Sequence, residues 1–198
     1  MHRDLTLFMF EAQTEPRMTF RRVAQRIRVP AGFVLLPLLL IASRPTLAWL
    51  IPGSCLAVLG LGIRAWASGY LRKNRELTTA GPYAHTRNPL YLGTLIMGSG
   101  VAFSTGALWF VAVFVAFYLL IYAPVMSAEA RTMVELFPSE YEDYRREVPL
   151  FLPRITPYRA RSKRKFEPSA YLKHREYRAA IGLVVVYALM AAKHLVFK

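Results

Sequence analysis

The chain has 198 residues, of which 55% are hydrophobic and 19% charged, and its formal net charge is +14. This composition is too apolar for an ordinary soluble domain of this size, and the mean hydropathy of +0.28 favours a polytopic membrane protein. Basic residues that border apolar spans are typical of membrane orientation and anionic lipid headgroups, and no groove-reading or base-stacking motif accompanies them. We therefore expect anionic membrane lipids as partners and no nucleic acid. The single cysteine, Cys55, excludes an intramolecular disulfide and a cysteine-rich metal site.

The first 42 residues divide into a polar arm and a short apolar stretch. Residues 1–28 mix acidic side chains with a late basic cluster and lack the order of a cleavable signal, which predicts a retained cytoplasmic arm. Residues 29–42 are apolar but short for a span of about 20 residues, and Pro30, Gly32 and Pro37 weaken them further as a regular helix. We predict that this stretch crosses the membrane with help from its flanks.

Three further apolar stretches predict four more spans. Residues 47–63 are uncharged and return the chain to its starting side, where Arg64 is expected to snorkel toward the interface. Residues 89–128 are also uncharged, which is about twice the length that one helix needs, and the polar break at 104–106 divides them into two antiparallel helices. Residues 179–192 form a fifth, short span.

The loop charges predict the orientation of these spans. Basic residues concentrate in the N-terminal arm, in the loop at 71–88 and in the segment at 127–178, whereas the opposite loops carry few. By the positive-inside bias, these segments are cytoplasmic and the C-terminus faces outward. The basic cluster at 159–165 is expected to lie on lipid headgroups.

The predicted fold class is all-α: a multi-pass membrane protein with about five transmembrane helices and a cytoplasmic helical region. We expect three parts, namely a basic N-terminal arm at 1–28, a membrane core with four spans at 29–158, and a basic linker with a C-terminal transmembrane helix at 159–198. The two long cytoplasmic segments hold the densest mix of polar, aromatic and conformationally special residues, so a site at the membrane surface is the natural hypothesis.

The first of these segments runs from 75 to 93. Gly81-Pro82 predicts a turn, and Pro89 suits the first turn of a helix because no amide donor is needed there. Arg87 and Asn88 then lie at the positively polarised N-terminus of that helix, where exposed amides can receive a carboxylate.

The second segment runs from 129 to 153. Glu129 follows an uncharged span directly, so it can meet an ammonium or a sulfonium where water is scarce. A carboxylate here can also pair with Arg131 or cap the following helix. Tyr141 and Tyr144 have helical spacing and are expected to pack a cytoplasmic helix onto the membrane surface, and the chain is expected to return over the site after Val148.

The order of four motifs carries a resemblance to a known family. They read Gly-Pro-Tyr at 81–83, Arg-Asn-Pro-Leu-Tyr-Leu-Gly at 87–93, Glu-x-x-x-Met-x-x-x-Phe-x-x-x-Tyr-x-x-Tyr at 129–144 and Val-Pro-x-x-x-Pro at 148–153. Over about 47–153 the chain resembles the isoprenylcysteine carboxyl methyltransferases and the related phospholipid N-methyltransferases. The resemblance implies a membrane-embedded S-adenosylmethionine site without a Rossmann fold, and the sequence offers no strand followed by a Gly-x-Gly-x-x-Gly turn.

The resemblance also implies particular site residues. Arg87 and Glu129 would be catalytic, and no metal ligands are expected. Ten positions match the family's cofactor contacts: Arg75, Glu76, Leu77, Thr78, Tyr83, Asn88, Pro89, Leu90, Tyr91 and Glu129. As purely structural alternatives, Arg87 can be a positive-inside anchor, and Tyr83 and Tyr91 can be interfacial belt aromatics.

Three departures from the family pattern leave the substrate open. Asn88 stands where eukaryotic members usually have histidine, Ala130 where a second glutamate is expected, and Val125 where an arginine would bind the substrate carboxylate. The expected substrate is a lipophilic molecule that enters from the bilayer, either an isoprenoid or prenylcysteine-like carboxylate or thiol, or an amine-headgroup phospholipid. Bacterial relatives often have Asn at the first of these positions, which favours a bacterial plasma membrane.

Two other functions remain open at this point. One is a non-catalytic lipid-binding protein on the same scaffold, which the alanine at 130 favours. The other is an NADPH-dependent membrane reductase related to the sterol reductases, although that class would call for a longer chain with more spans.

Overall fold

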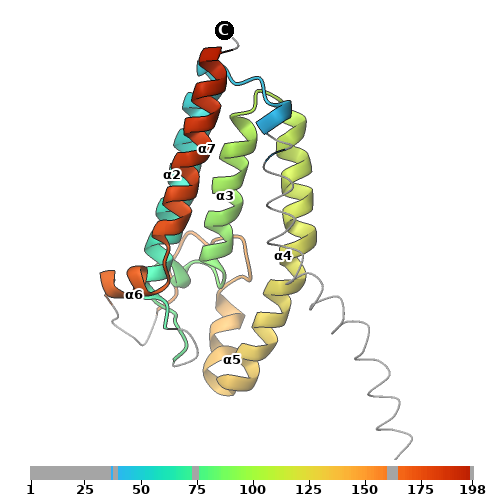
Figure 1. The fold of residues 1–198 in the computed structure, drawn as a ribbon. Coiled ribbons are helices and arrows are strands. Elements are labelled where there is room, and N and C mark those ends of the chain that lie inside the picture. The colour runs from blue at the N-terminus through green and yellow to red at the C-terminus, as the bar shows by residue number, and fades with distance from the viewer. Residues whose placement is uncertain (1–36, 38–39, 73–75, 160–164, 197–198) are drawn as a thin grey trace, which may run out of the picture.

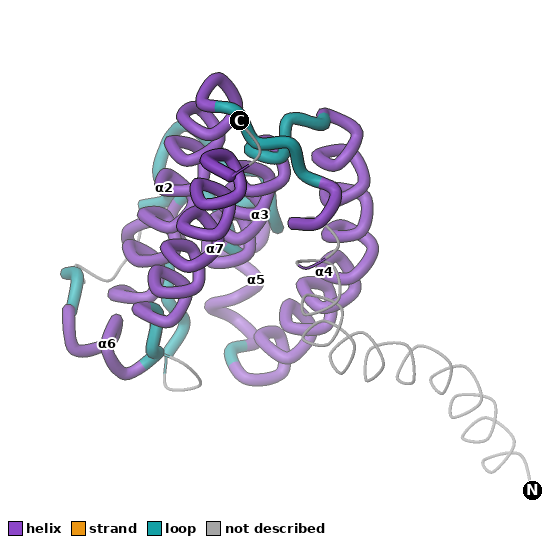
Figure 2. Tube along the Cα trace, turned by 45° about the horizontal axis from the view of Figure 1, so that its top comes forward, coloured by secondary structure: helices purple, strands orange, loops and turns teal. Residues whose placement is uncertain are grey.

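The computed structural model describes residues 37, 40–72, 76–159 and 165–196 (Figure 1). All regular elements in this part of the chain are helices. In chain order they are α2 (Leu47–Tyr70), the 3-10 helix η1 (Gly81–Ala84), α3 (Pro89–Phe103), α4 (Leu108–Leu136), α5 (Pro138–Glu147), α6 (Pro168–Lys173) and α7 (Tyr177–Val196). The long helices α2, α3, α4 and α7 run side by side, as Figures 1 and 2 show, and η1, α5 and α6 lie together at one end of the bundle, called here the site end.

Three of the helices are long and apolar enough to cross a membrane, namely α2, α4 and α7. The apolar helix α3 has 15 residues and is shorter than a full span. The prediction of an all-α multi-pass membrane protein is therefore confirmed. The predicted N-terminal arm and most of the predicted span at 29–42 lie outside the described residues, as does most of the basic cluster at 159–165.

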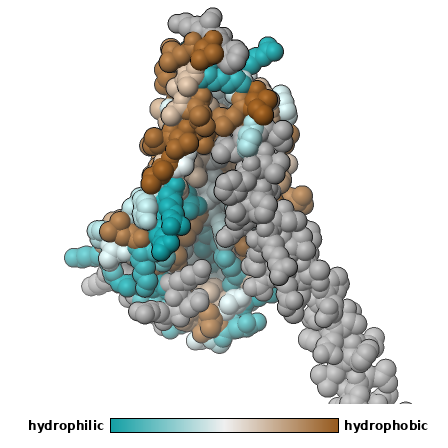
Figure 3. All heavy atoms as spheres, viewed as in Figure 1, coloured by the Kyte–Doolittle hydropathy of each residue, from teal (hydrophilic) through white to brown (hydrophobic). Residues whose placement is uncertain are grey.

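The surface of the long helices fits a lipid environment. Their outward faces expose large apolar side chains such as Ile51, Leu120 and Val184. Soluble proteins rarely expose apolar surface over so wide an area. Figure 3 shows hydrophobic side chains over the upper part of the bundle and hydrophilic ones gathered at the site end. The bundle thus has an apolar belt and one polar end.

Helices α2 and α3 pack closely because small residues line their interface. A Cβ atom at Gly60 would lie 2.6 Å from the carbonyl oxygen of Gly93 and would also meet the backbone of Met97. A Cβ at Gly53 would lie 2.7 Å from the carbonyl oxygen of Gly100. Backbones can approach this closely only where side chains are absent, which is the usual packing of membrane helices.

Helix boundaries differ from the prediction at the site end. α2 continues to Tyr70 and α4 continues to Leu136, so Glu129 lies inside α4 and not at its end. Both helices keep their hydrogen bonds after the apolar stretch ends, because helix geometry does not depend on the thickness of the membrane. The predicted break at 104–106 and the fifth span are both present.

The C-terminal segment packs along α2. At the site end, the Glu167 amide donates to the Gly69 carbonyl oxygen at 3.0 Å, and the Phe166 ring covers Gly69. At the far end, the Lys193 ammonium donates to the Leu40 and Ile41 carbonyl oxygens, both at 2.8 Å. Both ends of this segment are thereby fixed to the rest of the bundle.

Candidate active site

A cavity of about 620 Å³ opens at the site end, between α2, α3, α4 and α5. This volume is typical of sites that hold a small molecule or cofactor. The walls come from the end of α2 and the loop after it, from η1 and the start of α3, and from the second half of α4 with α5. The lining residues are Arg64, Leu71, Arg72, Glu76, Leu77, Thr78, Tyr83, Arg87, Asn88, Pro89, Leu90, Tyr91, Thr94, Tyr122, Glu129, Ala130, Thr132, Met133, Tyr141 and Tyr144.

The sequence-predicted site residues converge on this cavity. Arg75 lies outside the described residues, and every other predicted position lines the wall. These residues are Glu76, Leu77, Thr78, Tyr83, Arg87, Asn88, Pro89, Leu90, Tyr91 and Glu129. Segments separated by about 40 positions in the sequence therefore form one site, although their roles stay predictions.

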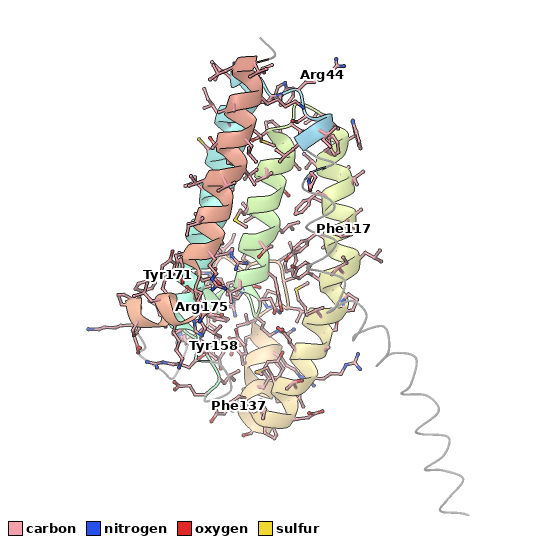
Figure 4. The ribbon with its side chains drawn as sticks, in the orientation of Figure 1. Arg44, Phe117, Phe137, Tyr158, Tyr171 and Arg175 are labelled. Atoms are coloured by element: carbon pink, nitrogen blue, oxygen red, sulfur yellow. The ribbon has the colours of Figure 1, made fainter. Side chains whose placement is uncertain are left out.

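The loop that carries Tyr83 and Arg87 is held from behind by α5 and the segment after it. The buried Tyr144 hydroxyl donates to the Tyr83 carbonyl oxygen at 2.6 Å. The Tyr158 amide donates to the Ala84 carbonyl oxygen at 2.9 Å, and the Arg87 amide donates to the Pro149 carbonyl oxygen at 3.0 Å. The sequence predicts that the chain after α5 returns over the site; in the structure this segment packs against the loop, and no described residue of it lines the cavity. Figure 4 shows Phe137 and Tyr158 at this end of the bundle, opposite Arg44.

Gly81 allows the loop to begin its turn. Its φ is +60°, a left-handed conformation that side chains disfavour, and a Cβ there would lie 2.8 Å from the Tyr70 ring. Pro82 follows within the 3-10 helix that carries Tyr83, a residue of the cavity wall.

Tyr83 is 7% exposed and lies among acidic groups. Burial raises the pKa of its hydroxyl well above the ordinary value, and the nearby carboxylates of Glu129 and Glu176 raise this pKa further. The hydroxyl is therefore neutral at physiological pH, where it can both donate and accept a hydrogen bond.

A hydrogen bond joins the two helices on either side of the cavity. The Tyr91 hydroxyl on α3 donates to Glu129 Oε1 on α4 at 2.7 Å. The Tyr91 ring meets the Tyr122 ring edge-on at 5.3 Å, and Tyr122 stacks on Tyr118 at 4.2 Å. Glu129 thus has a fixed orientation beside an aromatic wall.

Arg87 uses only part of its donor capacity within the described structure. Its Nη1 donates to the Tyr141 hydroxyl at 3.0 Å, and its guanidinium lies 5.7 Å from the Tyr141 ring centroid. Its Nε is buried and has no hydrogen-bond partner among the described residues. Arg87 nevertheless lines the cavity, where its guanidinium charge suits an anionic ligand group.

Asn88 immediately precedes α3, and Pro89 occupies the first helical position, as the sequence predicts. The Asn88 side-chain nitrogen Nδ2 donates to the Leu150 carbonyl oxygen at 2.9 Å. Its side chain therefore holds the segment after α5 against the start of α3, and Asn88 to Tyr91 line the cavity.

Comparison with known proteins identifies the part of the chain that builds most of these walls. Residues 48–140 match the phospholipid methyltransferase family. This segment is a phospholipid methyltransferase domain. The resemblance seen in the sequence is therefore confirmed at the level of the family.

Two curated relatives of the chain bear names from metal resistance. The cobalt-zinc-cadmium resistance protein CzcN of Cupriavidus metallidurans is 37% identical over 145 residues, which cover 68% of this chain and 65% of that protein. The nickel-cobalt-cadmium resistance protein NccN of Alcaligenes xylosoxydans xylosoxydans is 32% identical over 143 residues, which cover 68% of this chain and 66% of that protein. The chain thus spans just under two thirds of each relative. No solved structure matches it.

The cavity wall also contains residues that the sequence prediction missed. Arg64 was expected to snorkel toward the membrane interface, but it lines the cavity and donates to Thr94 Oγ1. Tyr141 and Tyr144 were expected to pack on the membrane surface, yet both are buried residues of the cavity wall. Both lie just beyond the matched segment. An arginine inside an apolar helix was the available signal for Arg64, because such residues usually face a functional interior.

Proposed function

We propose that this protein is an integral membrane methyltransferase that uses S-adenosylmethionine and methylates a lipophilic substrate. One observation carries the proposal: both motif segments of the phospholipid methyltransferase domain meet at a single cavity at one end of the apolar helices. We infer that this end is cytoplasmic because the basic loops gather there.

The chemistry of the cavity fits the proposed cofactor. The molecule carries a carboxylate, an ammonium and a sulfonium. The guanidinium of Arg87 and the N-terminus of α3 suit the carboxylate. The carboxylate of Glu129 suits a cationic group, and Tyr83 adds a neutral hydroxyl to the wall.

Alignment and exclusion of water are the main tasks that the protein performs. When bound, S-adenosylmethionine supplies a methyl group on sulfur; transfer breaks the sulfur–carbon bond, joins that carbon to the nucleophile and leaves a neutral thioether. Tyr91 orients Glu129, while Tyr144 fixes the loop that bears Tyr83. The rings of Tyr91 and Tyr122 form an aromatic part of the cavity wall.

The substrate is proposed to enter from the bilayer between α3 and α4. Thr94 and Tyr122 extend the cavity wall from the polar end into the apolar helices, which suits a molecule with one polar and one lipidic part. Val125 is buried in α4 and offers no charge for a substrate carboxylate. An amine-headgroup lipid or a thiol therefore fits these walls better than a prenylcysteine carboxylate.

The names of the two relatives support a second candidate at the level of physiology. We propose a bacterial inner-membrane protein that contributes to metal resistance, with methylation of a membrane component as its activity. Among the described residues no group of three metal-ligating side chains could hold a metal ion. Ala130 in the cavity wall is the observation that supports the scaffold alternative, a lipid-binding protein without catalysis.

Two measurements on the full chain in nanodiscs test the proposal. Calorimetric titration with S-adenosylmethionine should show micromolar binding, whereas titration with NADPH should show none. Incubation with methyl-labelled donor and total bacterial lipid should then yield a labelled lipid. Donor binding without labelling would support the scaffold alternative, and binding of NADPH alone would support a reductase.

A further inference from the structure

Two arginines in the cavity wall are paired with glutamates from the C-terminal segment. Arg64 and Arg72, from α2 and the residues just after it, both line the cavity. Arg64 contacts both carboxylate oxygens of Glu176, with Nη2 at 2.8 Å from Oε2 and 3.0 Å from Oε1. Arg72 Nη2 pairs with Glu167. Both glutamates lie outside the matched segment at 48–140.

Backbone contacts fix the positions of these glutamates. Glu167 immediately precedes α6 and is held by the hydrogen bond from its amide to Gly69. Glu176 immediately precedes α7, and its amide donates to the Tyr171 carbonyl oxygen at 3.4 Å. The C-terminal segment therefore brings both carboxylates to the α2 wall.

The two ion pairs differ in burial. The Arg64 and Glu176 side chains are 20% and 11% exposed, whereas those of Arg72 and Glu167 are 36% and 40% exposed. Water screens the second pair more strongly, so Glu176 has the larger influence on the cavity. Burial and then the Glu129 carboxylate raise the pKa of the buried Tyr83 hydroxyl, and the Glu176 carboxylate acts in the same direction.

The pairing lowers the formal charge of the described residues around the cavity. Among the described lining residues, three arginines and two glutamates give a formal charge of +1. Glu167 and Glu176 change that sum to −1. A positive wall would repel a sulfonium, and a negative wall attracts it.

We infer that the C-terminal segment completes the binding site, with Glu176 as the main residue that sets the preference for a cationic methyl donor over its neutral thioether product. The inference rests on the proposed function, because it takes S-adenosylmethionine as the ligand. Donor and product differ by one positive charge and one methyl group, so their affinity ratio reports the charge of the wall directly. Glu176 thus acts through Arg64 and through its field on the cavity.

The test compares Glu176→Gln with the wild type by calorimetry in nanodiscs. Each protein is titrated with S-adenosylmethionine and with S-adenosylhomocysteine. The substitution should weaken donor binding by about tenfold and leave product binding within about twofold, because only the donor carries the sulfonium charge. Glu167→Gln should change the ratio in the same direction by a smaller factor, and Glu142→Gln on the exposed face of α5 is the matched control.

A second variant distinguishes the effect of charge on ligand affinity from the structural effect of losing the ion pair. The double variant Arg64→Gln with Glu176→Gln removes both charges, so the ratio of donor to product affinity should return close to that of the wild type. Equal weakening of both ligands by Glu176→Gln would overturn the inference, because it would indicate a purely structural ion pair. If Glu176→Gln fails to fold, an unchanged ratio in Glu167→Gln overturns it instead. A wild type that binds neither ligand would refute the proposed function and this inference together.

Discussion

Tyr91 on α3 and Glu129 on α4, which both line the cavity, are joined by a 2.7 Å hydrogen bond. The phenol donates and the carboxylate accepts, so one carboxylate oxygen is oriented while the negative charge is kept. The two residues come from the two motif segments, so this contact joins both segments within one site. It also allows the charge of Glu129 and its orientation to be tested separately.

Glu129→Gln removes the charge and keeps an oxygen that can accept the bond from Tyr91. We expect S-adenosylmethionine binding to weaken by about 10- to 100-fold, since a charge-assisted contact contributes about 1.5–3 kcal/mol. Calorimetry in nanodiscs measures this, and Glu142→Gln should leave the affinity unchanged. An unaltered affinity in Glu129→Gln would remove Glu129 from the cofactor site.

Tyr91→Phe keeps the charge and removes the orienting hydroxyl. The expected loss of donor affinity is about fivefold, because one neutral donor contributes about 1 kcal/mol. The ring contact with Tyr122 should survive, so the melting temperature should change little. A loss as large as that of Glu129→Gln would indicate that the phenol contacts the ligand directly and does more than orient the carboxylate.

Much of the fold could be predicted from apolar length alone. Long uncharged stretches predict α2, α4 and α7, and the polar break at 104–106 predicts the turn between α3 and α4. Helix ends were less predictable, because polar residues continue α4 beyond the apolar run to Leu136. Hydropathy reports where lipid contact ends, whereas backbone hydrogen bonds decide where the helix ends.

The site was predictable where one segment carries its own pattern and not where distant segments meet. Gly81, Pro82 and Pro89 mark turns and helix starts, which located the first wall correctly. The pair of Arg64 and Glu176 joins positions 112 residues apart, and no local pattern indicates such a contact. Helical spacing likewise groups Tyr141 and Tyr144 on one face without indicating what that face contacts.

Tyr144→Phe should destabilise the loop that carries Tyr83. The Tyr144 hydroxyl donates to the Tyr83 carbonyl oxygen in a buried position, so the substitution leaves that acceptor without this partner. We expect a loss of about 1–3 kcal/mol in unfolding free energy and a lower melting temperature in detergent. Tyr177→Phe, at an exposed position on α7, is the control. Equal melting temperatures for the two variants would contradict the structural role of this bond.

Alkaline pH should weaken the protein through Tyr83. Burial, followed by the carboxylates of Glu129 and Glu176, raises the pKa of this hydroxyl above its ordinary value of 10.0. The folded state therefore retains a proton that the unfolded state loses above about pH 10, and stability falls as the pH rises beyond that point. Thermal unfolding from pH 8 to pH 11 should show this fall, and Tyr83→Phe should make it shallower. A slope identical to that of the wild type would show that Tyr83 does not contribute.

Gly60→Ala tests the packing of α2 on α3, on which the position of Arg64 relative to the start of α3 depends. The added Cβ would meet the backbone of Gly93 and Met97, and backbone atoms cannot move aside as a flexible side chain can. We expect a cost of about 1–3 kcal/mol, measured as a lower melting temperature in nanodiscs. Gly62→Ala on the same helix is a close control, because a Cβ there has no neighbour within 4 Å and alanine favours the helix. Gly62→Ala should therefore match or exceed the wild type in stability. If both variants lowered the melting temperature equally, the loss of stability would not come from close packing at Gly60. The proposal that this α2–α3 contact positions the site would then be rejected.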